Sequence, residues 1–160
     1  NLTPDMWSPD RRRDLTYAGI IEYSRLKKMN DIIQKILIVD DNDTHLRLIA
    51  KVLAMEGYQV FTAQNAEATI SSITENKPNL VILDVVMPGT NGYELCKILR
   101  QTPYNLQLPI VMLTAVQGED ERILAKEAGA NGVWSKPFDI DTIRENITIL
   151  LGDRQDQGSQ

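Results

Sequence analysis

Residues 80–92 read LVILDVVMPGTNG, a short apolar run that ends on Asp84 and continues into a loop containing Pro and Gly. Four apolar residues in succession, with neither helical nor alternating periodicity, are typical of a parallel strand that is covered on both faces. The Pro-Gly and Asn-Gly pairs that follow predict an irregular loop. Asp84 is therefore expected just outside the carboxyl end of a buried strand, where open doubly wound sheets bind their ligands.

Apolar runs alternate with amphipathic segments on both sides of this stretch, a pattern typical of successive βαβ units and a parallel sheet. The predicted strands correspond to the runs 36–39, 58–63, 80–83, 110–113 and 133–135. Helices are predicted between the strands. Their marker residues are a stripe of Leu46, Ile49, Val52 and Leu53 in the first, Ala68, Ile70 and Ile73 in the second, the inward-facing Leu95, Ile98 and Leu99 in the third, and Ile123, Leu124 and Ala128 in the fourth. A last helix is predicted over 139–151.

The length and the composition fit one globular domain with a short appendage. A chain of 160 residues with 42% hydrophobic residues can bury one full core. We assign 34–152 to this domain, 1–33 to an N-terminal helical extension or linker, and 153–160 to a polar tail. Within the extension a helix over 9–31 is predicted, because a Ser-Pro pair marks its start. Its imperfect apolar stripe could pack on the domain, pair with another copy or continue from an upstream domain.

The composition also disfavours several classes of function. A formal net charge of −5 argues against nucleic acid binding by the domain. No apolar run approaches the roughly 20 residues that span a bilayer, so no membrane segment is expected. The single Cys96 cannot form an internal disulfide, which fits a cytoplasmic location. We expect Cys96 to pack on the third helix rather than to act as a nucleophile.

Polar side chains follow four of the five predicted strands, namely Asp40 with Asp41, Asp84, Thr114 and Lys136. Because parallel strands place their carboxyl ends on one edge of the sheet, these side chains are expected to converge. Three crowded carboxylates stay ionised only beside positive charge, which Lys136 and a divalent cation would supply. Oxygen ligands completed by waters suit Mg²⁺ and leave room for an anionic group. The favoured chemistry is therefore a phosphoryl group accepted by Asp84 and bound by Thr114 and Lys136.

Four sequence runs at these strand ends resemble the receiver domain of two-component response regulators. They are ILIVDDN at 36–42, the stretch 78–92 with its Met-Pro-Gly, LTA at 113–115 and KPF at 136–138. The fold that the resemblance implies is α/β, a doubly wound, flavodoxin-like sheet of five parallel strands in the order 2-1-3-4-5, with helices on both faces. The function that it implies is a phosphorylation-controlled signalling switch of a two-component phosphorelay.

The resemblance also implies a role for each site residue. Asp84 would be the phosphoacceptor. Mg²⁺ would be bound directly by Asp41, by Asp84 and by the backbone carbonyl of Val86, with Asp40 acting through water.

Further implications concern the phosphoryl group and the partners. Thr114 and Lys136 would contact the phosphoryl group, and the Lys136–Pro137 peptide bond would be cis. The phosphoryl donor would be a sensor histidine kinase or a histidine phosphotransfer protein, and the output would pass to a downstream protein target. No direct nucleic acid or membrane partner is expected, and a homodimer remains open.

Other functions fit parts of this pattern. A pseudo-receiver would share the fold without phosphotransfer, although the set of acids, hydroxyl and ammonium is complete. A receiver excised from a hybrid kinase or longer regulator is a further alternative, since the chain begins with Asn1. An aspartyl phosphatase would place a second Asp at position 86, which is Val86, and a flavodoxin-type protein would not place acidic residues at 40–43, where phosphate must bind.

A few positions depart from the family pattern. Val133 stands where the family often has an aromatic residue that swings inward on activation, and Trp134 is expected on the opposite face of the strand. Val86 and Val116 flank the approach of water to the phosphoryl group and cannot orient that water. We therefore expect a phosphoacceptor rather than an enzyme, one that assists its own phosphorylation and dephosphorylates slowly. His45 is expected to be exposed rather than ligating.

Overall fold

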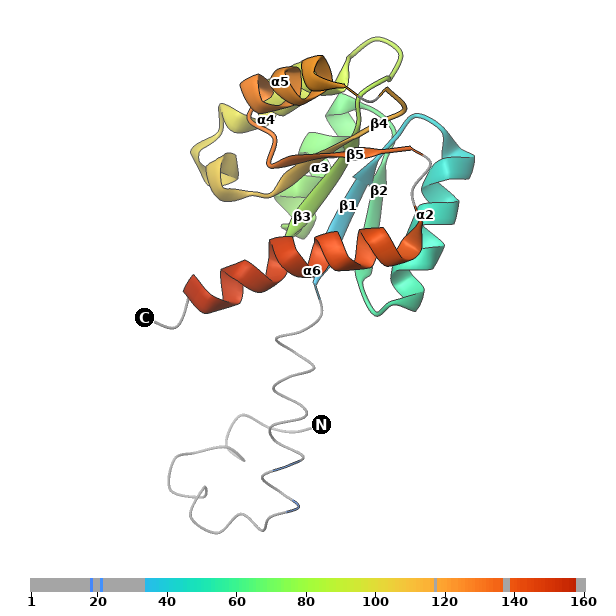
Figure 1. Cartoon of the computed structure of the whole chain (residues 1–160), viewed down its shortest axis with the longest axis vertical. Helices are drawn as coiled ribbons and strands as arrows, with labels where there is room; N and C mark the ends of the chain where they lie inside the picture. The colour runs from blue at the N-terminus through green and yellow to red at the C-terminus, as the bar shows by residue number, and fades with distance from the viewer. Residues whose placement is uncertain (1–17, 19–20, 22–33, 117, 137–138, 158–160) are drawn as a thin grey trace. The chain divides into compact units, whose positions relative to one another are not determined.

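The computed structural model describes residues 18, 21, 34–116, 118–136 and 139–157, the side chains of 152–157 excepted (Figure 1). The chain divides into two compact units, residues 1–33 and residues 34–160. The sheet and helices described below belong to the second unit. The helix expected over 9–31 lies outside the described residues apart from two positions, and so does the second residue of the Lys136–Pro137 bond.

Five parallel strands form one sheet in the order β2-β1-β3-β4-β5, which confirms the predicted doubly wound fold (Figure 1). The strands are β1 (Lys35–Val39), β2 (Gln59–Ala63), β3 (Leu80–Asp84), β4 (Ile110–Thr114) and β5 (Gly132–Ser135). Their register aligns the carboxyl ends, because Val39 pairs with Leu83, Asp84 with Leu113 and Thr114 with Ser135. The polar residues that end the strands are therefore brought to one edge of the sheet.

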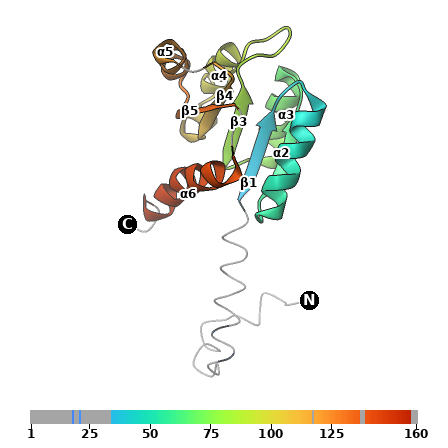
Figure 2. The same cartoon turned by 45° about the vertical axis from the view of Figure 1, so that its right-hand side comes forward.

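Helices cover both faces of this sheet (Figures 1 and 2). They are α2 (Asp43–Met55), α3 (Ala66–Asn76), α4 (Gly92–Arg100), the 3₁₀ helix η3 (Pro103–Gln107), α5 (Glu119–Ala128) and α6 (Ile140–Gln157). Alternate side chains of each strand enter two separate apolar clusters, as the two-residue repeat of a strand requires. One cluster joins the sheet to α3, α4 and α5, and the other joins it to α2 and α6.

Asparagine side chains fix the starts of three helices next to the carboxyl edge of the sheet. Asn42, Asn65 and Asn91 precede α2, α3 and α4, and each side-chain oxygen accepts a hydrogen bond from the backbone N–H three residues further on. An N-cap of this kind satisfies a backbone donor that has no partner within the helix. The loops that connect strands to helices at this edge therefore end at defined positions. Among the described residues, no helix is long and apolar enough to cross a membrane.

The helix faces that pack on the sheet differ in part from the apolar positions read from the sequence. Ile98 was expected to face inward but is exposed, as are Ile70, Ile123 and Leu124. Thr69 and Ser72 on α3 and Ala125 on α5 are buried without having been predicted, while Ala128 is also buried. Small side chains allow these helices to lie close to the sheet, and the buried Thr69 hydroxyl is satisfied by donating to the Asn65 carbonyl oxygen at 2.7 Å. The burial of Cys96 confirms its expected packing role.

The end of the chain also differs from the prediction. Helix α6 continues to Gln157 instead of ending near Leu151, so part of the expected polar tail is helical. Gly152 does not end the helix, because glycine inside a helix costs only about 1 kcal/mol relative to alanine, and residues 153–157 contain no proline. The loop before β4 contains η3, which begins at Pro103 and was not predicted.

Among the glycines whose surroundings the structure describes, Gly92 is the one where an added Cβ would come closest to neighbouring atoms. Its N–H donates to the Val85 carbonyl oxygen at 2.8 Å, and a Cβ at this position would lie 2.3 Å from the Asp84 carbonyl oxygen. We predict that Gly92→Ala lowers the free energy of unfolding by about 2 kcal/mol or more, because helix α4 must move away from β3. Urea denaturation measures this change.

Gly132→Ala is the matched control, because a Cβ at Gly132 would meet no other atom within 4 Å. Its free energy of unfolding should stay within about 0.5 kcal/mol of that of the unsubstituted chain. Equal stability of the two variants would contradict the close packing of α4 on the end of β3.

Candidate functional site

Three carboxylates meet at the carboxyl edge of the sheet. Asp84 is the last residue of β3, while Asp40 and Asp41 directly follow β1, the neighbouring strand. One oxygen from each of the three lies within 4.8 Å of the others. Asp40 and Asp84 are buried, with exposed fractions of 1% and 6%, whereas Asp41 is exposed. Two of the three charges therefore lie away from water, where their mutual repulsion is weakly screened.

Lys136 supplies the opposing charge. Its Nζ donates to Asp84 Oδ2 at 2.9 Å and lies 3.7 Å from Asp40 Oδ2. The lysine directly follows β5, and its backbone N–H donates to the Thr114 carbonyl oxygen at 2.7 Å, which extends the β4–β5 pairing by one residue. A half-buried ammonium held in this way stabilises both carboxylates at once.

The side chains that end β1, β3 and β4 share one local geometry. Asp40 Oδ1 accepts from the Asn42 N–H at 2.9 Å, Asp84 Oδ1 accepts from the Val86 N–H at 3.1 Å, and Thr114 Oγ1 accepts from the Val116 N–H at 3.1 Å. In each case a short polar side chain bonds the backbone two residues further on, as Asp, Asn, Ser and Thr do in turns. The strand ends thus orient their own polar groups before any ligand binds.

Thr114 is placed beside the acidic residues, but its hydrogen bond is to its own loop. The side chain is buried at the end of β4, the strand next to β3. Because Oγ1 accepts the bond from Val116, the hydroxyl proton is available to donate to a further acceptor, such as a phosphoryl oxygen. The Thr114 hydroxyl is therefore oriented by its own loop and makes no hydrogen bond to Asp84.

Asp40 Oδ2 is the atom whose surroundings best fit a bound cation. It is buried and has no hydrogen-bond partner in the described part of the chain. Burial raises the pKa of the Asp40 carboxyl, the nearby Asp84 charge raises it further, and the Asn42 N–H and Lys136 oppose the shift. Because its pKa is raised in the folded chain, the ionised Asp40 carboxyl lowers the free energy of unfolding when no metal is bound. This destabilisation is absent below the ordinary pKa of Asp and reaches its full size above the raised pKa. Three oxygen ligands with one unsatisfied carboxylate oxygen fit Mg²⁺.

His45 is a neighbour of the site that the sequence reasoning did not place there. It lies in the first turn of α2, is exposed as expected, and brings Nδ1 to 3.5 Å from Asp40 Oδ2. The signal for this position was its spacing from Asn42, since the residue three after an N-cap turns back over the start of the helix. Its nearness to Asp40 extends the polar surroundings of the carboxylates to α2.

The structure also describes the three positions that depart from the family pattern, together with Trp134 beside one of them. Val86 and Val116 are exposed on the loops after β3 and β4. Val133 packs against the cluster that contains α4 and α5, while Trp134 packs against the cluster that contains α2 and α6. Trp134 therefore lies on the opposite face of β5, as predicted, and cannot replace an aromatic ring at position 133.

Comparisons with known proteins identify the family of this chain. The chain matches the response regulator receiver domain over residues 36–148, so it belongs to that family. It is 37% identical over 118 residues to the alkaline phosphatase synthesis transcriptional regulatory protein PhoP of Bacillus subtilis, which covers 74% of this chain and 48% of PhoP. It is 31% identical over 117 residues to protein PilH of Pseudomonas aeruginosa, which covers 73% of this chain and 97% of PilH.

The fold is likewise similar to solved structures of the family. The crystal structure of chemotaxis protein CheY4 of Vibrio cholerae matches 74% of this chain and 99% of its own, with a TM-score of 0.71 and 28% identity. The chain spans about half the length of several curated relatives that it matches, PhoP among them. These matches confirm the family resemblance and the flavodoxin-like sheet order.

The buried acidic pair leads to a prediction about stability. Asp40→Asn removes a buried charge beside Asp84 while keeping an oxygen that can accept from the Asn42 N–H. We predict that it raises the free energy of unfolding of the metal-free chain at neutral pH by about 1 kcal/mol or more. Chemical denaturation in the presence of a chelator measures this change.

Asp41→Asn is the matched control, because Asp41 is exposed and its charge is screened by water. Its effect in the chelator should be smaller than that of Asp40→Asn. Added Mg²⁺ should then stabilise the unsubstituted chain more than the Asp40→Asn chain. A lower stability of Asp40→Asn in the chelator would show that Asp40 is not a source of strain.

Proposed function

We propose that this receiver domain is a phosphorylation-controlled switch of a two-component phosphorelay, with Asp84 as the phosphoacceptor. The observation that supports this most directly is the 2.9 Å contact between Lys136 Nζ and Asp84 Oδ2. It places a cation beside a buried carboxylate, an arrangement that suits a nucleophile largely shielded from water. The complete set of acids, hydroxyl and ammonium favours this function over a pseudo-receiver that only binds partners.

The reaction would be a phosphoryl transfer from a phosphohistidine. A carboxylate oxygen of Asp84 attacks phosphorus, a P–O bond forms, and the P–N bond to the donor imidazole breaks. The electron pair of that bond returns to the imidazole, which takes up a proton from solvent. Catalysis of such a transfer is mostly positioning and charge stabilisation, so residues that hold the acceptor and the phosphoryl oxygens suffice.

The residues around Asp84 would act at different stages of the transfer. The Val86 N–H and Lys136 orient the two oxygens of Asp84 before transfer. After transfer, Lys136 can pair with a phosphoryl oxygen, and the Thr114 hydroxyl can donate its proton to another. A Thr114 hydroxyl drawn toward the phosphoryl group would carry the loop after β4 with it, because its oxygen is bonded to the Val116 N–H.

Mg²⁺ is the cofactor that we assign to the site, held by Asp41, Asp84 and the Val86 carbonyl, with Asp40 acting through water. When bound, the ion would neutralise the crowded carboxylates and the charge of the phosphoryl oxygens. The chain's own contribution is the burial of Asp40 and Asp84 and the unsatisfied Asp40 oxygen.

The partners follow from the same proposal. The phosphoryl donor would be a sensor histidine kinase or a histidine phosphotransfer protein, and the output a contact with a downstream protein or a second copy. Relatives differ in this respect, since PhoP is a transcriptional regulatory protein about twice as long as the matched region, whereas PilH is matched over 97% of its length. A cytoplasmic location is part of this proposal, as is the role of a phosphoacceptor rather than an enzyme with turnover.

The acceptor assignment is tested by removing the nucleophile. Asp84→Asn keeps the shape of the side chain but not its charge, so we predict no phosphorylation by acetyl phosphate with Mg²⁺. Mass spectrometry of the intact protein detects the mass of one added phosphoryl group. Asp120→Asn, an exposed position on α5, is the control and should label normally. Undiminished labelling of the Asp84→Asn protein would refute the assignment and favour a different acceptor.

The lifetime of the phosphorylated state is a second prediction. Val86 and Val116 cannot orient an attacking water, so the unsubstituted protein should lose its label slowly at constant Mg²⁺. Val86→Asn combined with Val116→Glu should speed this loss tenfold or more, about 1 to 3 kcal/mol off the barrier. Both side chains are exposed, so the changes leave the core intact.

Met55→Asn combined with Ile149→Glu is the matched control, because it introduces the same polar residues at exposed apolar positions on α2 and α6. This variant should decay at the rate of the unsubstituted protein. Loss of label within seconds in the unsubstituted protein, or no change in the Val86 and Val116 variant, would show that these positions do not set the lifetime.

A further inference from the structure

One side-chain hydrogen bond joins the starts of α4 and α5. The Tyr93 hydroxyl, in the first turn of α4, donates to Glu121 Oε2, in the first turn of α5. Both residues are half-buried, and the Tyr93 ring packs against the apolar cluster that joins the sheet to α3, α4 and α5. Burial, together with the bond to Glu121 and its charge, raises the pKa of Tyr93. The phenol therefore keeps its proton and remains the donor.

The two ends of this hydrogen bond are attached to different strands. Tyr93 follows Gly92, whose N–H donates to the Val85 carbonyl oxygen at 2.8 Å, directly after β3. Glu121 belongs to α5, which follows the loop that leaves β4 at Thr114. The bond therefore connects the segment after the acceptor strand to the segment after the strand that ends on the hydroxyl. Any movement of one segment relative to the other must distort this bond.

The start of α5 is held only weakly by apolar packing. Its N-cap, Gly118, makes no side-chain hydrogen bond to the helix. The buried residues of α5, Ala125 and Ala128, lie in its second half, whereas Ile123 is exposed. A segment with few buried contacts moves at a low free-energy cost. The hydrogen bond from Tyr93 thus acts on a part of α5 that can be displaced.

The edge strand offers no aromatic side chain at this cluster. Val133 on β5 packs against the same apolar cluster as Tyr93, and its branched side chain has little rotamer freedom. The family often has an aromatic residue at position 133 that moves on activation, and this chain has none there. The Tyr93 ring on the neighbouring helix is therefore an alternative route by which a movement after β4 can be transmitted.

We propose that the hydrogen bond between Tyr93 and Glu121 is a latch, which holds α5 in its unphosphorylated position and so opposes phosphorylation of Asp84. This inference rests on the proposed function. A Thr114 hydroxyl that donates to the phosphoryl group draws Val116 with it through their 3.1 Å bond, and the start of α5 follows. Tyr93 stays with the end of β3, so the latch opens. The phosphoryl group and the latch favour different arrangements, and each therefore weakens the other.

Beryllofluoride with Mg²⁺ is a suitable probe, because a tetrahedral beryllium fluoride on a carboxylate resembles a phosphoryl group. It is titrated into the ¹⁵N-labelled 160-residue chain at constant Mg²⁺, and backbone amide shifts are followed by NMR. Tyr93→Phe removes the hydroxyl and keeps the ring. We expect this variant to bind beryllofluoride about threefold to tenfold tighter than the unsubstituted chain, the effect of one hydrogen bond on the fraction with an open latch. Before the probe is added, its α5 amide shifts should already lie closer to their probe-bound values.

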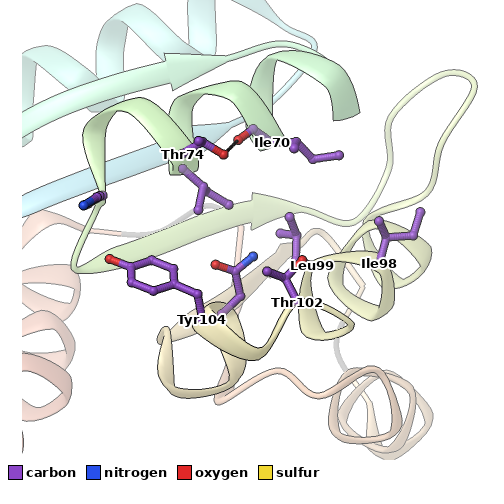
Figure 3. Close-up of a pocket in the computed structure, with 9 residues that line it drawn as sticks. Ile70, Thr74, Ile98, Leu99, Thr102 and Tyr104 are labelled. Atoms are coloured by element: carbon purple, nitrogen blue, oxygen red, sulfur yellow. Dashed lines mark hydrogen bonds between the residues drawn. The ribbon is translucent and has the colours of Figure 1, made fainter.

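Glu121→Ala removes the other end of the latch and should also tighten binding. Combined with Tyr93→Phe it should add nothing further, because both changes remove the same bond. Glu119→Ala is the matched control, since it removes the same charge from the first turn of α5 at an exposed position. Tyr104→Phe is the second control, because it removes a phenol hydroxyl from an exposed side chain on η3, at the hollow between α3 and α4 (Figure 3). Both controls should bind beryllofluoride as the unsubstituted chain does.

The outcomes distinguish the latch from the function on which it rests. Equal affinity of Tyr93→Phe and the unsubstituted chain would overturn the latch alone, and so would additive effects of Tyr93→Phe and Glu121→Ala. An equal gain in Glu119→Ala and Glu121→Ala would overturn it as well, since charge and not the bond would then be the cause. An unsubstituted chain that does not bind beryllofluoride would refute the proposed function and the latch with it. If Glu121→Ala fails to fold, the comparison of Tyr93→Phe with Tyr104→Phe still decides.

Discussion

At the site the ammonium group of Lys136 faces two buried carboxylates, so negative charge exceeds positive charge. Lys136 contacts Asp84 directly and Asp40 at longer range, and the Asp40 oxygen nearest to the lysine has no hydrogen-bond partner in the part of the chain described here. Burial makes each uncompensated charge costly, so the fold carries a local excess of negative charge that a cation or a phosphoryl group would change. The apolar strands around the site are what keep water from screening it.

Precision at this edge comes from the strands and from the turns that end them. The parallel register aligns the strand ends, and each polar side chain then bonds the backbone two residues further on. These bonds use only residues close in sequence, so they form with the turn and need no distant partner. Lys136 is different, because its place depends on the pairing of β5 with β4. The orientations of the Asp40, Asp84 and Thr114 side chains thus depend on local turns, whereas the position of the Lys136 ammonium depends on the pairing of β5 with β4.

The sequence predicted most of the sheet, because continuous apolar runs with polar ends have few other interpretations. It predicted helix faces less well. Ile98 was expected to face inward from its hydrophobicity but is exposed, and the small Ala125 is buried on α5, since close packing on a sheet selects for small volume as well as for apolar character. The nearness of His45 to Asp40 arises from tertiary contacts that no local pattern encodes. The same holds for Asn105 Oδ1, which has no hydrogen-bond partner among the described residues.

The strand that positions Lys136 lies at the edge of the sheet. β5 pairs only with β4, and its four residues are half-buried, whereas every residue of β3 and β4 is buried. Local opening of a fold begins where few buried contacts must be broken. Amide hydrogens of β5 should therefore exchange with solvent before those of β3, which holds Asp84. On this expectation the carboxylates follow strands that open slowly and the ammonium follows a strand that opens faster, so thermal opening of β5 would interrupt the compensation of the negative charge.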